Sequence, residues 1–294
     1  MRFVSMHVRY SLVGILLAAL LAGPVPGNAQ TAARNAKDAG EAASSSRHAA
    51  FGHVLTRYVD ADGQVDYARL KRQADSTLNP YLRWLGTTDP SGWSQTARLA
   101  FWINAYNAYT LKLIVDHYPV QTIWAITPGP PTPPKKQSPF QLEVGPVADT
   151  VRTLDEIEHE IIRVRFDEPR IHFAVVCAAK SCPRLRREAY TGPRLHAQLN
   201  DQARTFLHDD RKNEIPARDG RIALSRILKW YGDDFGASPR AVQRSLAPCF
   251  EGPVRERLRR GEYAIEYLPY DWALNDQALA EGAAPGRCRM RPAD

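Results

Sequence analysis

Beyond residue 29 the sequence lacks any apolar run of the roughly 20 residues that a membrane-spanning helix requires. It also lacks the His-Glu-x-x-His and Cys-x-x-Cys spacings of common zinc sites, a known nucleic-acid-binding motif and an internal repeat. These absences argue against an integral membrane protein, a zinc enzyme, a nucleic-acid-binding protein and a repeat protein. We therefore expect no metal and no other cofactor.

The beginning of the chain is typical of a cleaved secretory signal peptide. Arg2 and Arg9 lead into an apolar run, Ser11–Ala22, that is too short to span a bilayer. The small-residue pattern Gly27–Ala29 follows, which predicts cleavage after Ala29 and a periplasmic or secreted protein. The expected parts are a signal peptide (1–29), a flexible leader (30–50), one domain (51–276) and a C-terminal tail (277–294).

The charge is moderately basic. The formal net charge of +7 becomes +5 (7 minus 2) when Arg2 and Arg9 are removed with the signal peptide. The basic residues are spread along the chain, as in Arg184–Arg187 and Arg255–Arg260. We interpret them as a solvated surface, tolerant of anionic envelope polymers, and expect no nucleic-acid partner.

Cysteine is scarce, with four residues at Cys177, Cys182, Cys249 and Cys288. An even number in an exported chain favours disulfides, although a domain of this size does not need them. Of the three full pairings, proximity in the sequence suggests Cys177–Cys182 with Cys249–Cys288. Alternatively, one of the first two cysteines is a functional thiol.

Helical and strand patterns alternate irregularly along the chain. Helices are predicted at Tyr67–Leu85, Ser94–His117, Leu154–Val164, Pro193–His208 and Ala241–Leu246. Short strands are predicted at Gln141–Val144, Ile171–Cys177, Arg221–Leu224 and Tyr263–Tyr267. Because no regular βαβ alternation appears, we predict a single α+β domain, with a small, mainly antiparallel sheet packed against several helices.

The helix predicted at Ser94–His117 is apolar on almost every side, which is typical of a buried helix. Asn104 and Asn107 lie one turn apart on it, and buried amides must be hydrogen-bonded. Either they tie loop backbone to the core, or they orient a catalytic group or hold a substrate carbonyl.

The helix predicted at Leu154–Val164 begins with a capping-box pattern, Thr153–Glu156. Glu158 falls inside its apolar stripe, and His159 lies on the flank. A carboxylate placed there needs a cation or strong hydrogen-bond donors. Glu158 is therefore either half of a structural ion pair or a catalytic acid, base or orienting group.

The segment Arg170–Pro183 combines a histidine with two cysteines. In an extended strand His172 and Cys177 would face opposite sides, with backbones about 16 Å apart. A nucleophilic Cys177 would then need a base from elsewhere, and His159 is the better candidate. Cys182 competes for the role, because a cysteine before a helix N-terminus has a lowered pKa.

The chain resembles the domain of unknown function 547 family from about Phe51 to Asn275. The resemblance rests on five motifs in order: Trp102–Ala108, Leu154–His159, Ile171–Cys177, Ser181–Pro183 and Tyr270–Asn275. It implies no settled activity. In plant relatives a cysteine at the position of Cys177 is usual and one at Cys182 is not, which favours Cys177 as the functional thiol. The proline-rich loop Pro128–Pro134 departs from the family pattern.

Two classes of function follow. The first is a thiol-dependent hydrolase or acyl transferase with papain-like logic, acting on amide or ester bonds. Its expected residues are Cys177 as nucleophile, His159 as base, Glu158 as its orienting group, His172 as a second base, and Asn104, Asn107 and Cys182 as substrate contacts. The rival is a non-enzymatic envelope binding or structural protein with a buried polar network. Partners in either class are a small molecule, a peptide or an envelope polymer.

Overall fold

We analysed a computed structural model that describes residues 45–126, 138–215 and 220–281. The expected signal peptide, the loop Pro128–Pro134 and Cys288 lie outside these residues. A helix over residues 45–58 begins inside the expected leader, and α10 (Gln277–Glu281) begins inside the expected tail. Among the described residues, no helix has both the length and the apolar character needed to cross a bilayer.

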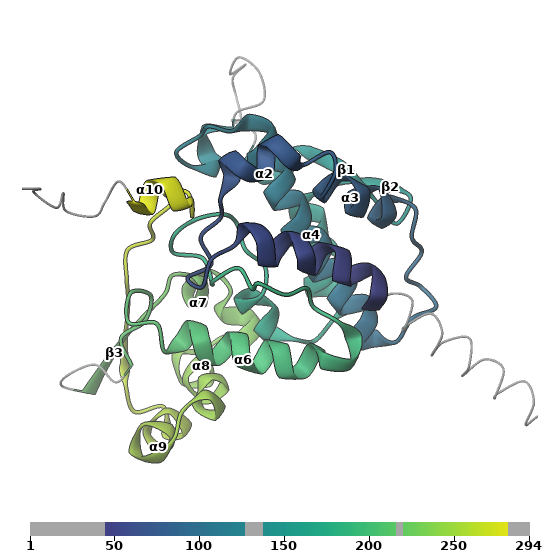
Figure 1. Cartoon of the computed structure of the whole chain (residues 1–294). Helices are drawn as coiled ribbons and strands as arrows, with labels where there is room; N and C mark the ends of the chain where they lie inside the picture. Colours follow the sequence, from purple (N-terminus) through teal and green to yellow (C-terminus); the bar gives the residue numbers. More distant parts are fainter. Residues whose placement is uncertain (1–44, 127–137, 216–219, 282–294) are drawn as a thin grey trace, which may run out of the picture. The chain divides into compact units, whose positions relative to one another are not determined.

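Helices dominate the fold (Figure 1). The further α-helices are α2 (Tyr67–Gln73), α3 (Leu78–Gly86), α4 (Gln95–His117), α5 (Arg163–Arg165), α6 (Leu195–Leu207), α7 (Ile227–Trp230), α8 (Pro239–Leu246) and α9 (Gly252–Arg260). The 3-10 helices are η1 (Ile123–Ala125), η2 (Pro139–Gln141), η4 (Pro169–Phe173), η5 (Gly192–Arg194), η7 (Gly232–Phe235) and η8 (Ala247–Cys249), and η3 (Glu156–Ile162) is a π-helix.

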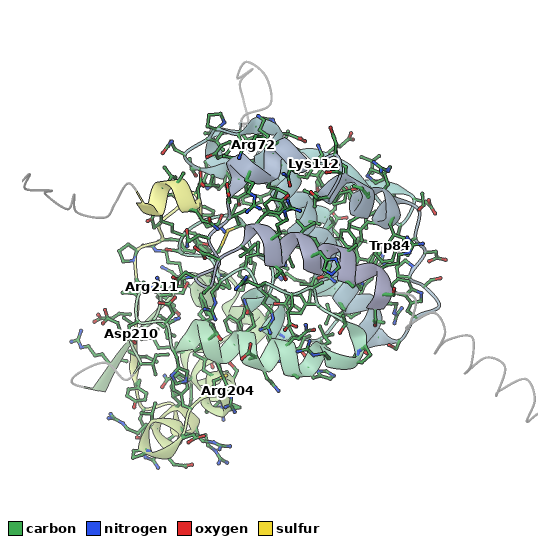
Figure 2. The ribbon with its side chains drawn as sticks, viewed as in Figure 1. Arg72, Trp84, Lys112, Arg204, Asp210 and Arg211 are labelled. Carbon is green, nitrogen blue, oxygen red and sulfur yellow. A yellow bond between two sulfur atoms is a disulfide. The ribbon has the colours of Figure 1, made fainter. Side chains whose placement is uncertain are left out.

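Helix α4 is the centre of the larger hydrophobic core. Ser94 caps its N-terminus by accepting a hydrogen bond from the Ala97 amide, and every residue from Leu99 to Leu111 is buried. Helices α2 and α3 pack on it (Figure 1). In Figure 2 the labelled Trp84 of α3 lies beside the helix over residues 45–58, where its ring is 5.2 Å from that of His48. The prediction of a buried helix is confirmed to within one residue.

Within residues 45–126, 138–215 and 220–281 the strands form two pairs. β1 (Glu143–Val147) and β2 (Thr150–Thr153) form an antiparallel hairpin. β3 (Arg221–Leu224) and β4 (Ala264–Tyr267) pair in parallel, since the intervening chain runs through α7, α8 and α9 before it returns. The α+β class is confirmed, with one antiparallel and one parallel pair in place of one mainly antiparallel sheet.

The strand predicted at Ile171–Cys177 is wrong. Residues Pro169–Phe173 form the 3-10 helix η4, and from there to Cys177 the chain pairs with no strand in the described part of the structure. A short run that is apolar on both faces is buried in either backbone form, so periodicity could not separate them. The side chain of Asn107 replaces a neighbouring strand, because its oxygen accepts from the Val176 amide (2.9 Å) and its nitrogen donates to the Ala174 carbonyl (3.0 Å).

Segment 169–177 joins two hydrophobic cores. Phe173 belongs to a second core with residues of α6, β3, α8 and α9, whereas Ala174–Val176 belong to the core around α4. His172 is therefore held where the two cores meet.

The C-terminal segment joins parts of the chain that are distant in sequence. The Leu274 amide donates to Gln121, the Asn275 amide donates to Ala178, and the Asn275 carbonyl accepts from the Val65 amide. The Tyr67 hydroxyl adds a bond of 2.8 Å to the Asn275 side chain. In Figure 1 the yellow helix α10 accordingly lies near α2 and the end of the helix over residues 45–58.

Candidate functional site

A pocket of about 240 Å³ lies beside the junction of the two cores. Its lining consists of Tyr106, Phe140, Asp155, Glu158, His159, His172, Val175, Cys177, Cys182, Pro183, Ile227, Trp230, Tyr231, Tyr270 and Trp272. Aromatic rings and titratable groups therefore share one concave surface. A pocket of this composition is the default candidate for a ligand or active site.

The pocket gathers five of the seven residues expected from the sequence: Glu158, His159, His172, Cys177 and Cys182. The other two, Asn104 and Asn107 on α4, hydrogen-bond to backbone groups. Asn104 accepts from the Tyr190 amide (2.9 Å) and donates to the Tyr190 carbonyl (2.8 Å), and Asn107 bonds the segment Ala174–Val176 as described above. These contacts correspond to the structural role considered for both amides.

Glu158 is presented by the π-helix η3. The capping box forms as its sequence pattern indicates, with reciprocal bonds between Thr153 and Glu156. The helix then widens, and π-turns of this kind occur frequently at functional sites. Glu158 is only 6% exposed, and the hydroxyls of Tyr106 and Tyr231 hydrogen-bond to its carboxylate. Among the described residues no lysine or arginine lies within ion-pair distance of it.

His172 is held by a carboxylate on the far side of its ring. Its Nε2 lies 2.6 Å from Asp234 Oδ2, and Arg163 forms a bidentate pair with Asp234 at 2.7 Å for both bonds. The Arg163 guanidinium, more than His172, holds the pKa of Asp234 down at about 2. Burial lowers the pKa of His172, although its bond to Asp234 opposes the shift.

The protonation of His172 follows from these contacts. Because Asp234 is ionised and can only accept, the neutral ring carries its proton on Nε2. Nδ1 is then an acceptor. It is buried without a hydrogen-bond partner in the described structure, and it lies 4.0 Å from Glu158 Oε1. Tyr231 stacks on the same ring, with centroids 3.9 Å apart.

His159 lies at a more exposed edge, with 38% of its side chain accessible. Its Nδ1 is 3.3 Å from the Arg163 guanidinium, and its Nε2 is 4.0 Å from Asp155. Since Arg163 can only donate, the Nδ1 lone pair is engaged. Burial raises the pKa of the Asp155 carboxyl, whereas nearby His159 opposes that rise.

Cys177 and Cys182 form a disulfide in the pocket wall. The Tyr270 hydroxyl lies 3.4 Å from Cys177 Sγ and 3.2 Å from Cys182 Sγ. Bridged cysteines carry no thiol, so a nucleophile at this site requires reduction of the bond. Cys249 is not bridged to any described residue, and burial raises the pKa of its thiol.

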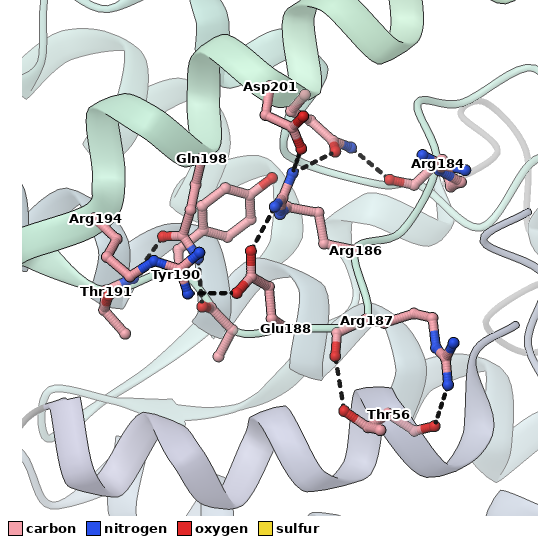
Figure 3. A network of polar contacts seen from close by, with 12 residues as sticks. Thr56, Arg184, Arg186, Arg187, Glu188, Tyr190, Thr191, Arg194, Gln198 and Asp201 are labelled. Carbon is pink, nitrogen blue, oxygen red and sulfur yellow. Dashed lines mark hydrogen bonds and ion pairs between the residues drawn. The ribbon is translucent and has the colours of Figure 1, made fainter. Parts of the chain in front are cut away.

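Ion pairs and hydrogen bonds hold residues 184–194, which follow the pocket residue Pro183 in the sequence (Figure 3). Arg186 is paired with Glu188 and with Asp201 of α6, and only 14% of its side chain is exposed. Arg187 donates to the Thr56 carbonyl at 3.2 Å. Part of the basic run interpreted as a solvated surface is therefore a structural clamp. In Figure 2 the labelled Arg211 and Asp210 mark the turn that follows α6.

Several residues that line or support the pocket carry no pattern that would mark them in the sequence. Asp234, Tyr231 and Trp230 lie in and beside α7 and η7, and no catalytic pattern marks them. Tyr270 and Trp272 belong to a motif quoted above, which gave them no role. Among the described residues no group of three or more His, Cys, Asp or Glu side chains is arranged to hold a metal ion.

Comparison with known proteins yields one match. No curated protein and no solved structure is significantly similar to the chain. Residues 90–207 match the model of a family described as "Protein of unknown function, DUF547". The matched segment carries Glu158, the two pocket histidines and both bridged cysteines, while the lining from Ile227 to Trp272 lies beyond it. The match supports a DUF547 family domain at residues 90–207 of this chain.

Proposed function

We propose that the pocket binds a ligand through a protonated amino group, in a protein exported to the periplasm or beyond. The observation that carries the proposal is the pair of acceptors at Glu158 and His172. Glu158 Oε1 and His172 Nδ1 are 4.0 Å apart, and Nδ1 has no hydrogen-bond partner among the residues that the structure describes. One nitrogen with several N–H groups could donate to both at about 2.9 Å from each.

Electrostatics favour a cation over a neutral donor. A buried carboxylate normally requires a positive partner, and within the described part of the chain Glu158 receives tyrosine hydroxyls and no Lys or Arg. Asp155 adds a second carboxyl to the lining, whereas Arg163 is engaged by Asp234. An ammonium group would supply both the missing charge and the missing hydrogen-bond donors.

The walls suit the organic part of such a ligand. Tyr106, Tyr231 and Tyr270 line the pocket together with Trp230 and Trp272. Trp230 and Trp272 stack with centroids 5.9 Å apart, and Trp230 is 45% exposed. Aromatic faces attract cations and cover apolar carbon, so they would stabilise an aliphatic or ring-bearing amine.

The test compares n-butylammonium with n-butanol, which has nearly the same shape and no charge. Titration followed by tryptophan fluorescence and calorimetry should give saturable binding of the amine with a Kd of about 1 mM, or about −4 kcal/mol. Butanol should bind at least about tenfold more weakly. Equal binding of the two would refute the proposal without any mutation.

Matched variants locate the binding. Glu158→Gln should weaken butylammonium binding by about tenfold or more, because a charged hydrogen bond is lost. Glu160→Gln removes an exposed carboxylate from the same helix and should leave binding unchanged. Nα-acetyl-lysine amide and glucosamine then distinguish an amino-acid side chain from an amino sugar as the source of the amine.

A second candidate is the thiol hydrolase or acyl transferase in a reduced form of the protein. It is favoured by His172, whose ring is oriented by Asp234 on one nitrogen and free on the other, in the pocket that contains Cys177. On this reading His172 is a better base than His159, because Arg163 engages His159 Nδ1.

The chemistry of this candidate requires an external dithiol. The dithiol is oxidised, and the Cys177–Cys182 bond gains two electrons and two protons. Cys177 then gives its proton to His172 and attacks the substrate carbonyl carbon. The leaving amine or alcohol takes that proton, and water hydrolyses the thioester.

The test of the second candidate is hydrolysis of p-nitrophenyl esters and anilides by reduced protein. Cys177→Ala and His172→Gln should abolish turnover, and His159→Gln should not. Full activity of Cys177→Ala would eliminate this mechanism and leave amine binding unaffected.

A further inference from the structure

The two sulfurs of the pocket disulfide lie in different surroundings. Cys182 is only 2% exposed, whereas Cys177 is partly exposed, and both line the pocket. A thiol entering from solvent therefore reaches Cys177 before Cys182. The sulfur that is not attacked becomes the leaving thiolate. Attack on the more exposed Cys177 therefore makes Cys182 the leaving group.

Hydrogen-bond donors gather around the less exposed sulfur. The Cys177 amide donates to Cys182 Sγ at 3.1 Å, and the Tyr270 hydroxyl lies 3.2 Å from the same atom. Lys212 donates to the Cys182 carbonyl at 2.5 Å, which brings a cation beside this residue. Hydrogen bonds and nearby positive charge stabilise a thiolate and make it a better leaving group.

Lys212 itself is held in place by the turn after α6. Only 10% of its side chain is exposed, and Asp209 lies 3.8 Å away. Burial lowers the pKa of Lys212 to about 8, while Asp209 opposes the shift, so the ammonium is largely protonated near neutral pH. The Tyr270 hydroxyl stays protonated because burial raises its pKa. When Cys182 becomes charged, the Tyr270 hydroxyl is therefore available as a donor to its sulfur, and Lys212 supplies a positive charge at its carbonyl.

We infer that the Cys177–Cys182 disulfide undergoes thiol–disulfide exchange with a small organic thiol that enters the pocket. The thiolate of that molecule attacks Cys177 Sγ, a new S–S bond forms, and the Cys177–Cys182 bond breaks. The electron pair leaves with Cys182, whose thiolate is received by the Cys177 amide and Tyr270. The thiolate of a second small molecule attacks the sulfur of the first, the bond between that sulfur and Cys177 Sγ breaks, and the two small molecules leave as their disulfide. The protons of the two small thiols end on Cys177 and Cys182, which are left reduced. This activity goes beyond amine binding and does not require it.

The experiment traps the mixed disulfide on folded wild-type protein. The protein is treated with 2-mercaptoethanol, quenched with iodoacetamide and mapped by mass spectrometry. The expected product carries mercaptoethanol on Cys177 and the alkyl group on Cys182. Mercaptoethanol on Cys182, or no adduct until denaturant is added, would overturn the inference.

Two tyrosine variants test the leaving-group argument. Tyr270→Phe removes the hydroxyl beside Cys182 and should slow exchange by roughly threefold to tenfold. Tyr267→Phe, in β4, removes a hydroxyl that contacts neither sulfur and should leave the rate unchanged. Equal rates for wild type and Tyr270→Phe would contradict stabilisation of Cys182 by the hydroxyl.

A second thiol links this activity to the proposed function while keeping the two separable. Cysteamine carries an ammonium group, and at equal thiolate concentration it should react faster than 2-mercaptoethanol if Glu158 attracts the amine. Loss of that preference in Glu158→Gln would support both proposals. Exchange with no preference for cysteamine would count against amine binding alone.

Discussion

His48 and His172 are two buried histidines among aromatic rings, in regions that differ in what surrounds them. His48 Nδ1 lies 2.8 Å from the Tyr81 hydroxyl and 3.1 Å from Asn104 Nδ2, and Trp84 packs edge-on against its ring. His172 has Asp234 on one side and Glu158 on the other, and it lines a pocket. Burial alone lowers the pKa of His48 to about 3, whereas at His172 a carboxylate opposes the effect of burial.

The difference shows which features indicate a site. Both rings have one nitrogen without a hydrogen-bond partner among the described residues. Around His48 the neighbouring groups are aromatic rings, a tyrosine hydroxyl and an amide, which make a core. Around His172 an acceptor without a described partner coincides with Glu158, a carboxylate that has no Lys or Arg beside it among the described residues, and with open volume. An unsatisfied nitrogen therefore points to a ligand only where charge and space accompany it.

The largest loss of stability is expected from removing either of the two asparagine side chains of α4, one beside the His48 core and one beside the His172 pocket. Asn104→Ala and Asn107→Ala each leave a buried backbone N–H and C=O without a partner, and each should lower the free energy of unfolding by about 2–5 kcal/mol in urea titrations. Butylammonium binding should weaken only in Asn107→Ala, because Asn107 holds the pocket wall at Ala174–Val176. Equal loss of binding in both variants would remove the distinction between core and pocket.

Measuring the free energy of unfolding across a pH series tests the region around His48. The folded state resists protonation of His48 until about pH 3, whereas the unfolded chain takes up the proton near pH 6.5. The unfolded state therefore binds more protons in this window, and stability falls as the pH falls from 6.5 towards 3. The loss attributable to His48 should be about 3 kcal/mol by pH 4.

Two variants on one helix isolate that histidine. His48→Gln should flatten the dependence of the unfolding free energy on pH, while His53→Gln, at an exposed position of the same helix, should preserve the wild-type slope. An unchanged slope in His48→Gln would mean that another group dominates the acid response.

A smaller effect is expected at the carboxylate beside the pocket. The pKa of Asp234 is lowered from 3.8 to about 2, chiefly by Arg163, so its contribution to stability is complete above pH 3.8 and is lost as the pH falls towards 2. Asp234→Asn should cost about 1 kcal/mol at pH 7 and progressively less below pH 3.8. Asp233→Asn, at the exposed neighbouring position, is the control, and a cost independent of pH would argue against the ion pair.

Much of the fold could be predicted from the sequence where local pattern and burial agree. Helix α4 is buried on all sides from Leu99 to Leu111 and starts at a serine cap, and the predicted bounds of β3, Arg221–Leu224, are the observed ones. Segment 169–177 could not be predicted in this way, because the partner that replaces a strand neighbour is the side chain of Asn107 from a distant helix. The widening of η3 into a π-helix likewise leaves no mark in a helical pattern.

For the site, sequence supplied the reactive residue types and structure supplied their pairing. Glu158 was recognised because a carboxylate in an apolar stripe needs a partner, and those partners are Tyr106 and Tyr231 rather than a nearby arginine. The sequence does not mark Asp234, because an aspartate in a turn is common. Only the fold places it against His172, which lies 62 residues earlier in the chain. Long-range pairing of this kind leaves no periodic signal.

The segment Leu274–Asp276 also determines when, during synthesis of the chain, the pocket can form. It bonds to residues near both Val65 and Ala178, and the aromatic residues Tyr270 and Trp272 immediately precede it. A chain still emerging from the ribosome therefore has its cysteines and histidines long before it has the wall that encloses them. Chemistry at the pocket must wait until Tyr270 and Trp272 have been made, and a chain cut short before Tyr270 would have the reactive residues without this wall of the pocket.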